Sequence, residues 1–271
     1  MFAILTLAFT SACSTSSFFF EPVKEYRAEP DSSICATEEV SFPSGNGKRL
    51  TGWVLAPKEQ PHIASVLYLH GNYGNVSLFL FPVEPLVAAG FQVLTFDYQG
   101  YGKSEGEPSQ EAVLADAQAA LDFAKARPDF AGLPLVVFGQ SMGGHAAVAL
   151  VARNPGKVDA LATEGAFTGF KDEAEWTARR SGSPPGLTRA FVPQAYRALD
   201  EIGSVHVPLL VAHSVDDDVV PFSMGEELFA KANEPKTFWK VTGRHVRAAQ
   251  VDPQGFRDHF LALVRTGREV K

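Results

Sequence analysis

The stretch FGQSMGGHA near the middle of the chain places Ser141 between glycines, at the junction of two apolar segments. The segment before it, Leu133–Phe138, is short and rich in branched and aromatic residues, which is typical of a buried strand. The segment after it, Ala146–Ala152, has no polar stripe and predicts a buried helix. A turn this sharp needs residues that tolerate crowding and unusual backbone angles, which explains Gly139 and Gly143. The stretch is therefore predicted to be a strand, a tight turn and a helix.

Strand and helix signals alternate along most of the remaining chain, which predicts an α/β fold with a mostly parallel sheet and helices on both faces. At 271 residues and 45% hydrophobic content, the chain can bury the core of one such domain, which we place at residues 37–271. Residues 168–204 lose the alternation, and we predict a small helical lid there. Strands are expected at residues 38–44, 50–57, 63–70, 91–98, 133–138, about 158–165, 207–213 and 236–241, the first two forming a hairpin, with helices at 77–90, after Ser109, after Ser141, after a Ser223 cap and from about Pro253.

The first thirteen residues, MFAILTLAFTSAC, differ from the rest of the chain. Phe2–Phe9 has the length of a signal-peptide apolar region and is much too short to span a bilayer. It ends in small residues before Cys13, which resembles the lipobox of bacterial lipoproteins, whose cysteine is lipidated and becomes the mature N-terminus. Two features depart from that motif: Thr10 stands where Leu is usual, and no Lys or Arg precedes the apolar run.

We therefore expect residues 1–13 to be a signal peptide, with Cys13 as the lipidation site, and residues 14–36 to be a tether. The protein would then be exported and held on a bacterial membrane by a lipid anchor rather than a transmembrane helix, on the periplasmic or cell-surface side. Two alternatives remain open: the apolar run is a hydrophobic N-terminal strand or helix, or Cys13 forms a disulfide with Cys35 in an unlipidated exported protein.

Charge and motif content exclude several classes of function. Acidic residues outnumber basic ones, 31 to 24, so a nucleic-acid partner is not expected. The stretch DYQGYGKS ends like a phosphate-binding loop, but Asp97 stands where that motif needs glycine. The aspartates 216–218 could suggest a calcium loop, but the later Gly and Glu of such a loop are missing. We predict neither a cofactor nor a metal.

Gly139–Gly143 matches G-x-S-x-G, in which the serine is the nucleophile at a strand-to-helix turn. A serine hydroxyl needs a base to take its proton and an acid to orient that base, and on this type of fold both follow the serine in the order acid, then histidine. His245 is the best base, because it lies on a loop just after the strand at 236–241. His259 lies within the last helix and is better explained as a half-exposed helical residue. The other histidines come too early in the chain: His62, His70, His145, His206 and His213.

Two further groups complete the predicted site. Three aspartates follow the strand at 207–213, and Asp217 lies in the middle of the loop, so we predict it as the acid rather than Asp216 or Asp218. The stretch YLHGNYGN ends another strand in a glycine-containing turn, which can aim backbone N–H groups at a developing oxyanion. We predict Asn72 and Met142 as the two donors of this oxyanion hole.

Together, HGNYGN, FDYQGYGKSEG, GQSMGG, HSVDDDVVP and GRH resemble the α/β-hydrolase superfamily over roughly residues 37–268, and in particular serine hydrolases related to the depalmitoylating α/β-hydrolase-domain proteins. The resemblance implies Ser141, Asp217 and His245 as a catalytic triad. It extends to bacterial lipoprotein members, which also carry a short aromatic stretch soon after the lipidated cysteine. Ser214 stands where related loops often have Gly, and arginines flank His245, so the substrate does not carry over.

The expected function is hydrolysis of a carboxylic ester or thioester through an acyl-enzyme, with a small-molecule ester or acyl compound as substrate. A serine peptidase or an acyltransferase on the same fold is the alternative enzyme. A catalytically silent protein that uses the pocket for binding is the alternative from another class.

Overall fold

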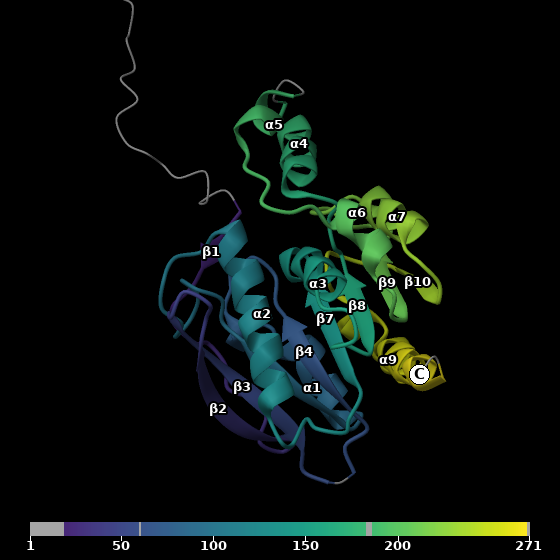
Figure 1. Cartoon of the computed structure of the whole chain (residues 1–271). Helices are drawn as coiled ribbons and strands as arrows, with labels where there is room; N and C mark the ends of the chain where they lie inside the picture. The colour runs from purple at the N-terminus through teal and green to yellow at the C-terminus, as the bar shows by residue number, and fades with distance from the viewer. Residues whose placement is uncertain (1–18, 60, 183–185, 270–271) are drawn as a thin grey trace, which may run out of the picture.

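The structure, a computed structural model, describes residues 19–59, 61–182 and 186–269. Its centre is an eight-stranded sheet in the order β10-β9-β8-β7-β4-β6-β3-β2 (Figure 1). The pairs β2–β3 and β3–β6 are antiparallel and all other pairs are parallel, so the predicted hairpin does form one edge of an otherwise parallel sheet. The mostly parallel α/β sheet predicted from the sequence is therefore confirmed.

The strands of this sheet are β2 (Cys35–Pro43), β3 (Arg49–Pro57), β4 (Ala64–Leu69), β6 (Phe91–Phe96), β7 (Leu135–Gln140), β8 (Ala160–Glu164), β9 (Leu209–Ser214) and β10 (Lys236–Val241), and a separate parallel pair joins β1 (Glu21–Pro22) to β5 (Tyr73–Gly74). The α-helices are α1 (Leu80–Ala88), α2 (Gln110–Ala126), α3 (Met142–Ala152), α4 (Phe170–Arg180), α5 (Leu187–Phe191), α6 (Ala198–Glu201), α7 (Phe222–Lys231), α8 (Ala248–Val251) and α9 (Pro253–Glu269), and the short 3-10 helices are η2 (Val76–Leu78) and η3 (Ile202–Ser204).

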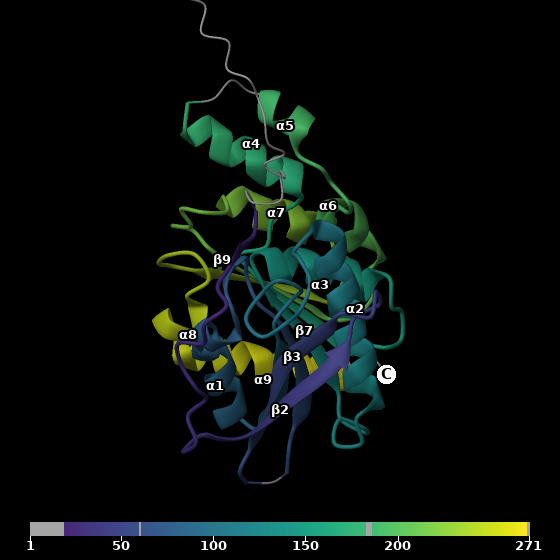
Figure 2. The ribbon, with the colours of Figure 1, turned by 90° about the vertical axis from the view of Figure 1, so that its left-hand side faces the viewer.

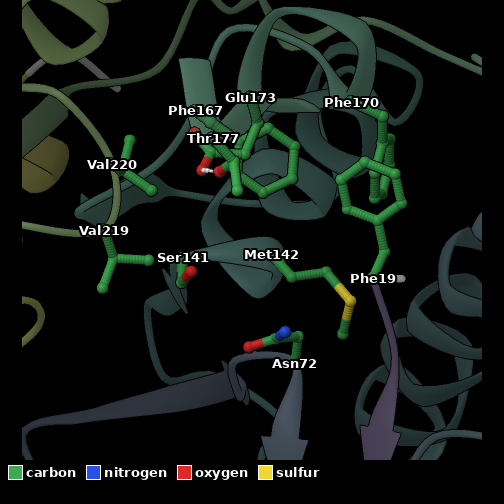
Figure 3. A pocket seen from close by; sticks show the side chains of 10 residues that line it. All are labelled: Phe19, Asn72, Ser141, Met142, Phe167, Phe170, Glu173, Thr177, Val219 and Val220. Carbon is green, nitrogen blue, oxygen red and sulfur yellow. Dashed lines mark hydrogen bonds between the residues drawn. The ribbon is translucent and has the colours of Figure 1, made fainter. Parts of the chain in front are cut away.

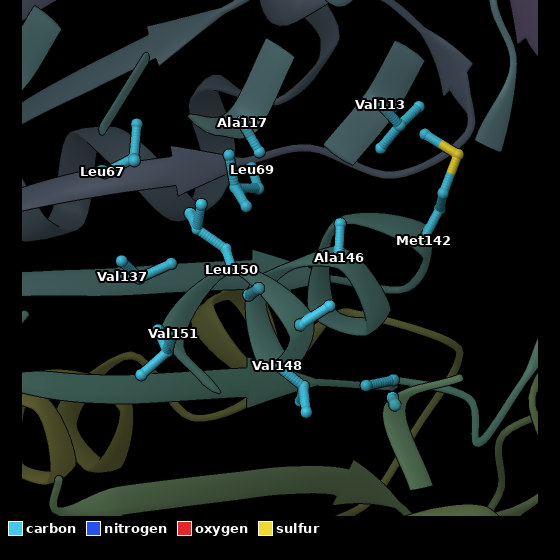
Figure 4. Packing of buried hydrophobic residues seen from close by; sticks show 14 of the residues in the cluster. Leu67, Leu69, Val113, Ala117, Val137, Met142, Ala146, Val148, Leu150 and Val151 are labelled. Carbon is cyan, nitrogen blue, oxygen red and sulfur yellow. The ribbon is translucent and has the colours of Figure 1, made fainter. Parts of the chain in front are cut away.

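Side chains alternate between the two faces of the sheet, so each face has its own apolar core. In β7, Val137 belongs to the cluster that contains the inner faces of α2 and α3 (Figure 4). Its neighbours Val136 and Phe138 belong to the cluster that contains α1 and α9. A strand covered on both faces must be apolar throughout, which is why β7 has no polar alternation.

Helix starts show where local sequence decides the structure and where it does not. Ser109 caps α2 as predicted, with its hydroxyl accepting a hydrogen bond from the N–H of Ala112 at 3.0 Å. The predicted Ser223 cap is wrong, because α7 begins at Phe222 directly after Pro221. The N–H of Met224 donates to the Pro221 carbonyl at 2.9 Å, so the turn closes on the proline and Ser223 already lies inside the helix.

The region predicted to be a lid, residues 168–204, contains α4, α5 and α6, and α4 and α5 stand above the body of the domain in Figure 2. The segment before β2, predicted as a tether, packs against the domain from Phe19 onward. Phe19 and Phe20 are buried, and both rings contact Phe170 of α4 with centroid distances of 5.1 and 6.4 Å. These residues therefore belong to the folded unit together with the lid.

The predicted signal peptide and Cys13 lie outside the described residues. Cys35, at the start of β2, is a buried free thiol. The alternative of a Cys13–Cys35 bridge involves a residue outside the described part of the chain. Within residues 19–59, 61–182 and 186–269, no helix is both long and apolar enough to cross a membrane.

Candidate active site

Ser141 occupies the turn between β7 and α3 in a backbone conformation that non-glycine residues rarely adopt, with φ 54° and ψ −118°. The two glycines of the motif make the turn sterically possible. A Cβ atom on Gly139 would overlap the carbonyl of Gly143, and one on Gly143 would overlap the carbonyl of Leu69 at the end of β4. The glycines therefore let the turn pack directly against neighbouring backbone, and the N–H of Ser141 donates to the Glu164 carbonyl at 2.9 Å.

The structure brings Asp217 and His245 together, as predicted. His245 Nδ1 lies 2.7 Å from Asp217 Oδ2 in a contact that joins the loops after β10 and β9. The other oxygen of Asp217 accepts the N–H groups of Val219 and Val220, each at 2.9 Å. Burial alone would raise the pKa of Asp217, but the hydrogen bonds and the charge of His245 outweigh it and hold the pKa below its usual value. The carboxyl is thus kept ionised beside the imidazole.

The neighbouring aspartates have other partners. Asp216 accepts the N–H of Gly243 at 3.0 Å, which ties the two loops together. Asp218 lies 3.8 Å from Arg244 at the surface. Of the three aspartates, Asp217 is the one hydrogen-bonded to His245.

The second nitrogen of His245, Nε2, is buried and has no hydrogen-bond partner among the described residues. Gly165 adjoins the ring, since a Cβ on that glycine would lie 2.8 Å from His245 Cε1. The preceding residue, Glu164, holds the N–H of Ser141. The Glu164–Gly165 segment is therefore in contact with both the elbow and the imidazole.

Asn72 and Met142 lie beside Ser141 at the wall of one cavity (Figure 3). Met142 is the first residue of α3, so its N–H has no partner within the helix. The carbonyl of Asn72 accepts the hydroxyl of Tyr101 at 2.7 Å and the N–H of Glu21 at 3.1 Å, which fixes the orientation of its peptide. The two predicted oxyanion donors thus come from the ends of neighbouring strands, β4 and β7.

The cavity has a volume of about 210 Å³ and lies between the lid and the carboxyl ends of the strands. Seven of its ten lining residues were not predicted to be functional, among them Phe19, from the N-terminal segment, and Glu173, from α4. No local motif marks either residue, since each reaches the site through tertiary packing. The complete lining of the cavity is Phe19, Asn72, Ser141, Met142, Phe167, Phe170, Glu173, Thr177, Val219 and Val220.

Two other buried histidines, His145 and His70, have structural surroundings. His145 lies between the rings of Phe167 and Tyr196, and burial lowers its pKa to about 3. His70 is fully buried, with its Nδ1 2.7 Å from the Gly71 carbonyl, and burial lowers its pKa to about 4. In the described part of the chain, no group of His, Cys, Asp and Glu side chains is arranged to hold a metal ion.

Comparison with known proteins places the chain in a family. Residues 60–183 match a family model described as "Serine aminopeptidase, S33". The uncharacterized protein YfhR of Escherichia coli K12 is 32% identical over 237 residues, covering 85% of this chain and 80% of that protein. The α/β-hydrolase domain-containing protein WAV2 of Arabidopsis thaliana is 32% identical over 218 residues, covering 77% and 71%. The chain belongs to the α/β-hydrolase superfamily.

Solved structures agree on the fold. An esterase from Pyrococcus furiosus, Pf2001, superposes with a TM-score of 0.76 over 91% of this chain and 97% of that one, at 18% identity. The comparisons support a hydrolase on the α/β-hydrolase fold.

One feature of this α/β-hydrolase that sequence motifs do not reveal is a hydrogen-bonded chain beneath the site, centred on Glu164. Glu164 is fully buried at the end of β8, and one of its oxygens accepts the side-chain amide of Gln140 at 2.7 Å. The other accepts the N–H of Ala248 at 2.8 Å, three residues beyond His245. Gln140 in turn accepts the hydroxyl of Tyr68 at 2.5 Å. This chain joins β4, the residue before the nucleophile and the histidine loop.

We predict that Glu164→Gln weakens both the fold and the site, because glutamine has one acceptor oxygen where two donors converge. An unsatisfied buried donor costs about 1–3 kcal/mol of unfolding free energy. Displacing the Ala248 end moves His245, so the labelling rate of Ser141 by a fluorophosphonate should fall at least roughly tenfold, since 1.4 kcal/mol is one decade of rate. Thermal unfolding and labelling kinetics measure the two effects.

In the double variant Glu164→Gln with Gln140→Glu, which exchanges the two side chains, every hydrogen-bond donor again has an acceptor. This variant should recover most of the labelling rate. Asp116→Asn is the control, since Asp116 is a buried carboxyl of α2 bonded to Ser44 and Gln99 away from the site. Equal losses of labelling in Glu164→Gln and Asp116→Asn, matched to their losses of stability, would contradict a positioning role.

Proposed function

We propose that the protein is a serine hydrolase that cleaves carboxylic esters through an acyl-enzyme, with Ser141, His245 and Asp217 as its triad. The observation that carries this proposal is the 2.7 Å contact between His245 Nδ1 and the buried Asp217 carboxylate, on loops beside the strained elbow of Ser141. That contact leaves Nε2 as the free nitrogen of the ring. A neutral imidazole whose Nδ1 carries the proton presents Nε2 as a base.

In this mechanism, His245 Nε2 takes the proton of Ser141 as Oγ attacks the ester carbonyl. The N–H groups of Asn72 and Met142 stabilise the negative charge that develops on the carbonyl oxygen. The tetrahedral intermediate collapses, the C–O bond to the alcohol breaks, and His245 returns the proton to the leaving alkoxide. Water then attacks the acyl-serine with His245 again acting as base, which releases the carboxylic acid and free Ser141. Asp217 stabilises the imidazolium formed in each half-reaction.

The choice of an ester as substrate is supported by the esterases among proteins of the same fold. The family model whose description names an aminopeptidase favours a peptide amide as the second candidate. The resemblance to depalmitoylating hydrolases makes thioesters a third candidate class of substrate, which the same acyl-enzyme chemistry can cleave.

We predict that a fluorophosphonate probe labels the wild-type protein and does not label Ser141→Ala, because the probe requires an activated serine. In parallel, p-nitrophenyl esters should be turned over faster than the p-nitroanilides and thioesters of the same acyl groups. Labelling is read by mass spectrometry of the modified peptide, and turnover by absorbance. A folded wild-type protein that takes no label would favour the binding-protein alternative, and faster amide cleavage would favour the peptidase.

The acid of the proposed triad can be tested by comparing substitutions of the three neighbouring aspartates. Asp217→Asn should lower kcat strongly, by on the order of 10⁴ as in the serine protease where the triad aspartate was replaced. Asp216→Asn and Asp218→Asn keep an acceptor oxygen and should lower kcat less than about tenfold, the equivalent of one neutral hydrogen bond. Ester hydrolysis by the three purified variants is the measurement. A mild Asp217→Asn variant beside an inactive neighbour would show that the register is wrong by one.

We further propose that Cys13 carries a lipid anchor on an exported protein. Phe19, which lines the cavity, comes only six residues after Cys13. An extended chain spans about 3.5 Å per residue, so the anchor would keep the cavity within about 20 Å of the lipid surface.

The wild-type protein, expressed from its full sequence in a bacterium, should then fractionate with membranes, and Cys13→Ser should appear in the soluble fraction. Cys35→Ser removes the other cysteine and should remain with the membranes. A wild-type protein that is soluble with its N-terminal residues intact would overturn the lipid-anchor proposal without bearing on the triad.

A further inference from the structure

A carboxyl group that the proposed mechanism does not use lies in the wall of the cavity. Glu173, on the lid helix α4, is 8% exposed and lines the same cavity as Ser141 (Figure 3). Its Oε1 accepts the hydroxyl of Thr177 at 3.3 Å. Its Oε2 is buried and has no hydrogen-bond partner among the described residues. A buried polar atom without a partner is uncommon in folded proteins and calls for an explanation.

The surroundings of Glu173 disfavour its ionised form. The other lining residues are mostly apolar, with Phe167, Phe170 and Val220 among them. The charged groups that act on Glu173 are Asp217, across the cavity wall, and Arg180, on its own helix. Arg180 donates to the backbone carbonyl of Asp218, and it forms no ion pair with Glu173 within the described residues. A buried carboxyl without a cation takes up a proton rather than remain charged.

The expected protonation agrees with this geometry. Burial raises the pKa of Glu173 to about 8, the negative charge of Asp217 acts in the same direction, and the Thr177 hydrogen bond and Arg180 oppose it. At neutral pH the group is therefore mainly a carboxylic acid, which can donate one hydrogen bond and accept others.

We propose that Glu173, as a neutral carboxylic acid, donates a hydrogen bond to an oxygen atom in the acyl group of the substrate, in addition to the scissile ester. The preferred acyl groups are then not plain alkyl chains. They carry an ether, hydroxyl or carbonyl oxygen at the position where the acyl group meets the roof of the cavity. This inference rests on the proposed serine esterase function. A neutral oxygen satisfies Glu173 without ionising it, whereas an ammonium group would have to lose its hydration and also draw the proton from the acid.

The test compares acyl groups of equal size that differ in one atom. p-Nitrophenyl methoxyacetate is matched with the butyrate, and the 3-methoxypropionate with the pentanoate, so that an acceptor-only oxygen replaces one methylene. For each pair we take the ratio of kcat/KM for the methoxy ester to kcat/KM for the alkyl ester. Comparing this ratio between protein variants cancels the intrinsic reactivity of the two esters. Glu173→Leu should lower the ratio for at least one pair by about three- to tenfold, the contribution of one neutral hydrogen bond. Glu173→Gln keeps a donor and should retain the ratio.

The pH dependence gives a second readout that does not depend on a variant folding. Below about pH 8 the wild-type acid is protonated and can donate, and above it the donor is lost, so the ratio should fall between about pH 7 and pH 9. Any effect of pH on the reaction steps common to both esters of a pair cancels in the ratio. In Glu173→Gln the ratio should stay constant over the same range.

Glu175→Gln is the matched control, because Glu175 lies on the same helix and pairs with Arg179 and Arg189 at the surface. It should leave the ratio unchanged. The proposal is overturned if the ratio is the same in wild type and Glu173→Leu for both pairs and does not change with pH. It is also overturned if the β-alanyl ester, which carries an ammonium group, is preferred over the butyrate and that preference is lost in Glu173→Gln. Failure of the esterase proposal would be distinct, since neither ester of a pair would then be cleaved.

Discussion

The site depends on holding one serine in a backbone conformation that it would not adopt alone. A non-glycine residue at positive φ costs on the order of 1–3 kcal/mol, and such a residue persists only where its surroundings leave no alternative. Here the surroundings are backbone: Gly143 packs against the end of β4, and the N–H of Ser141 is held by the carbonyl of Glu164. Since α3 begins at the very next residue, any relaxation of Ser141 would have to move a buried helix as well.

The order of strands in the sheet arranges the chemical groups around that serine. The carboxyl ends of parallel strands lie at one edge, so neighbouring strands present their following residues side by side. Strands β10, β9, β8, β7 and β4 are consecutive neighbours, and each leads into one element of the candidate site. In that order, the residues they deliver are His245, Asp217, Glu164, Ser141 and Asn72. The proposed triad and oxyanion hole therefore follow from the topology of the fold, and the lid adds the roof of the cavity with Glu173 in it.

A part of the fold or of the candidate site could be predicted from the sequence where neighbouring residues in the chain determine it. The elbow, the aspartate loop and the histidine loop were predicted because each combines a strand pattern with residues whose chemistry is specific. Glu164, Glu173 and Phe19 were not, because their roles come from contacts with segments far away in the chain. The predicted Ser223 cap was wrong for a related reason. The sequence pattern fits a capping box, but the helix is capped at Pro221 and starts two residues earlier than that pattern predicts.

The N-terminal segment also has a mechanical position in the molecule. Its short strand β1 is bonded along β5, with Glu21 donating to the Asn72 carbonyl and Val23 to that of Gly74. A force applied to the chain at Phe19 would thus act on the packing against Phe170 and, through Glu21, on the peptide that orients one side of the candidate oxyanion hole. A shortened chain that begins at β2 would lose the Phe19 part of the cavity wall and one of the two hydrogen bonds to the Asn72 carbonyl, while keeping every residue of the central sheet. The leading segment is in this sense a working part of the site, although it contains none of its chemical groups.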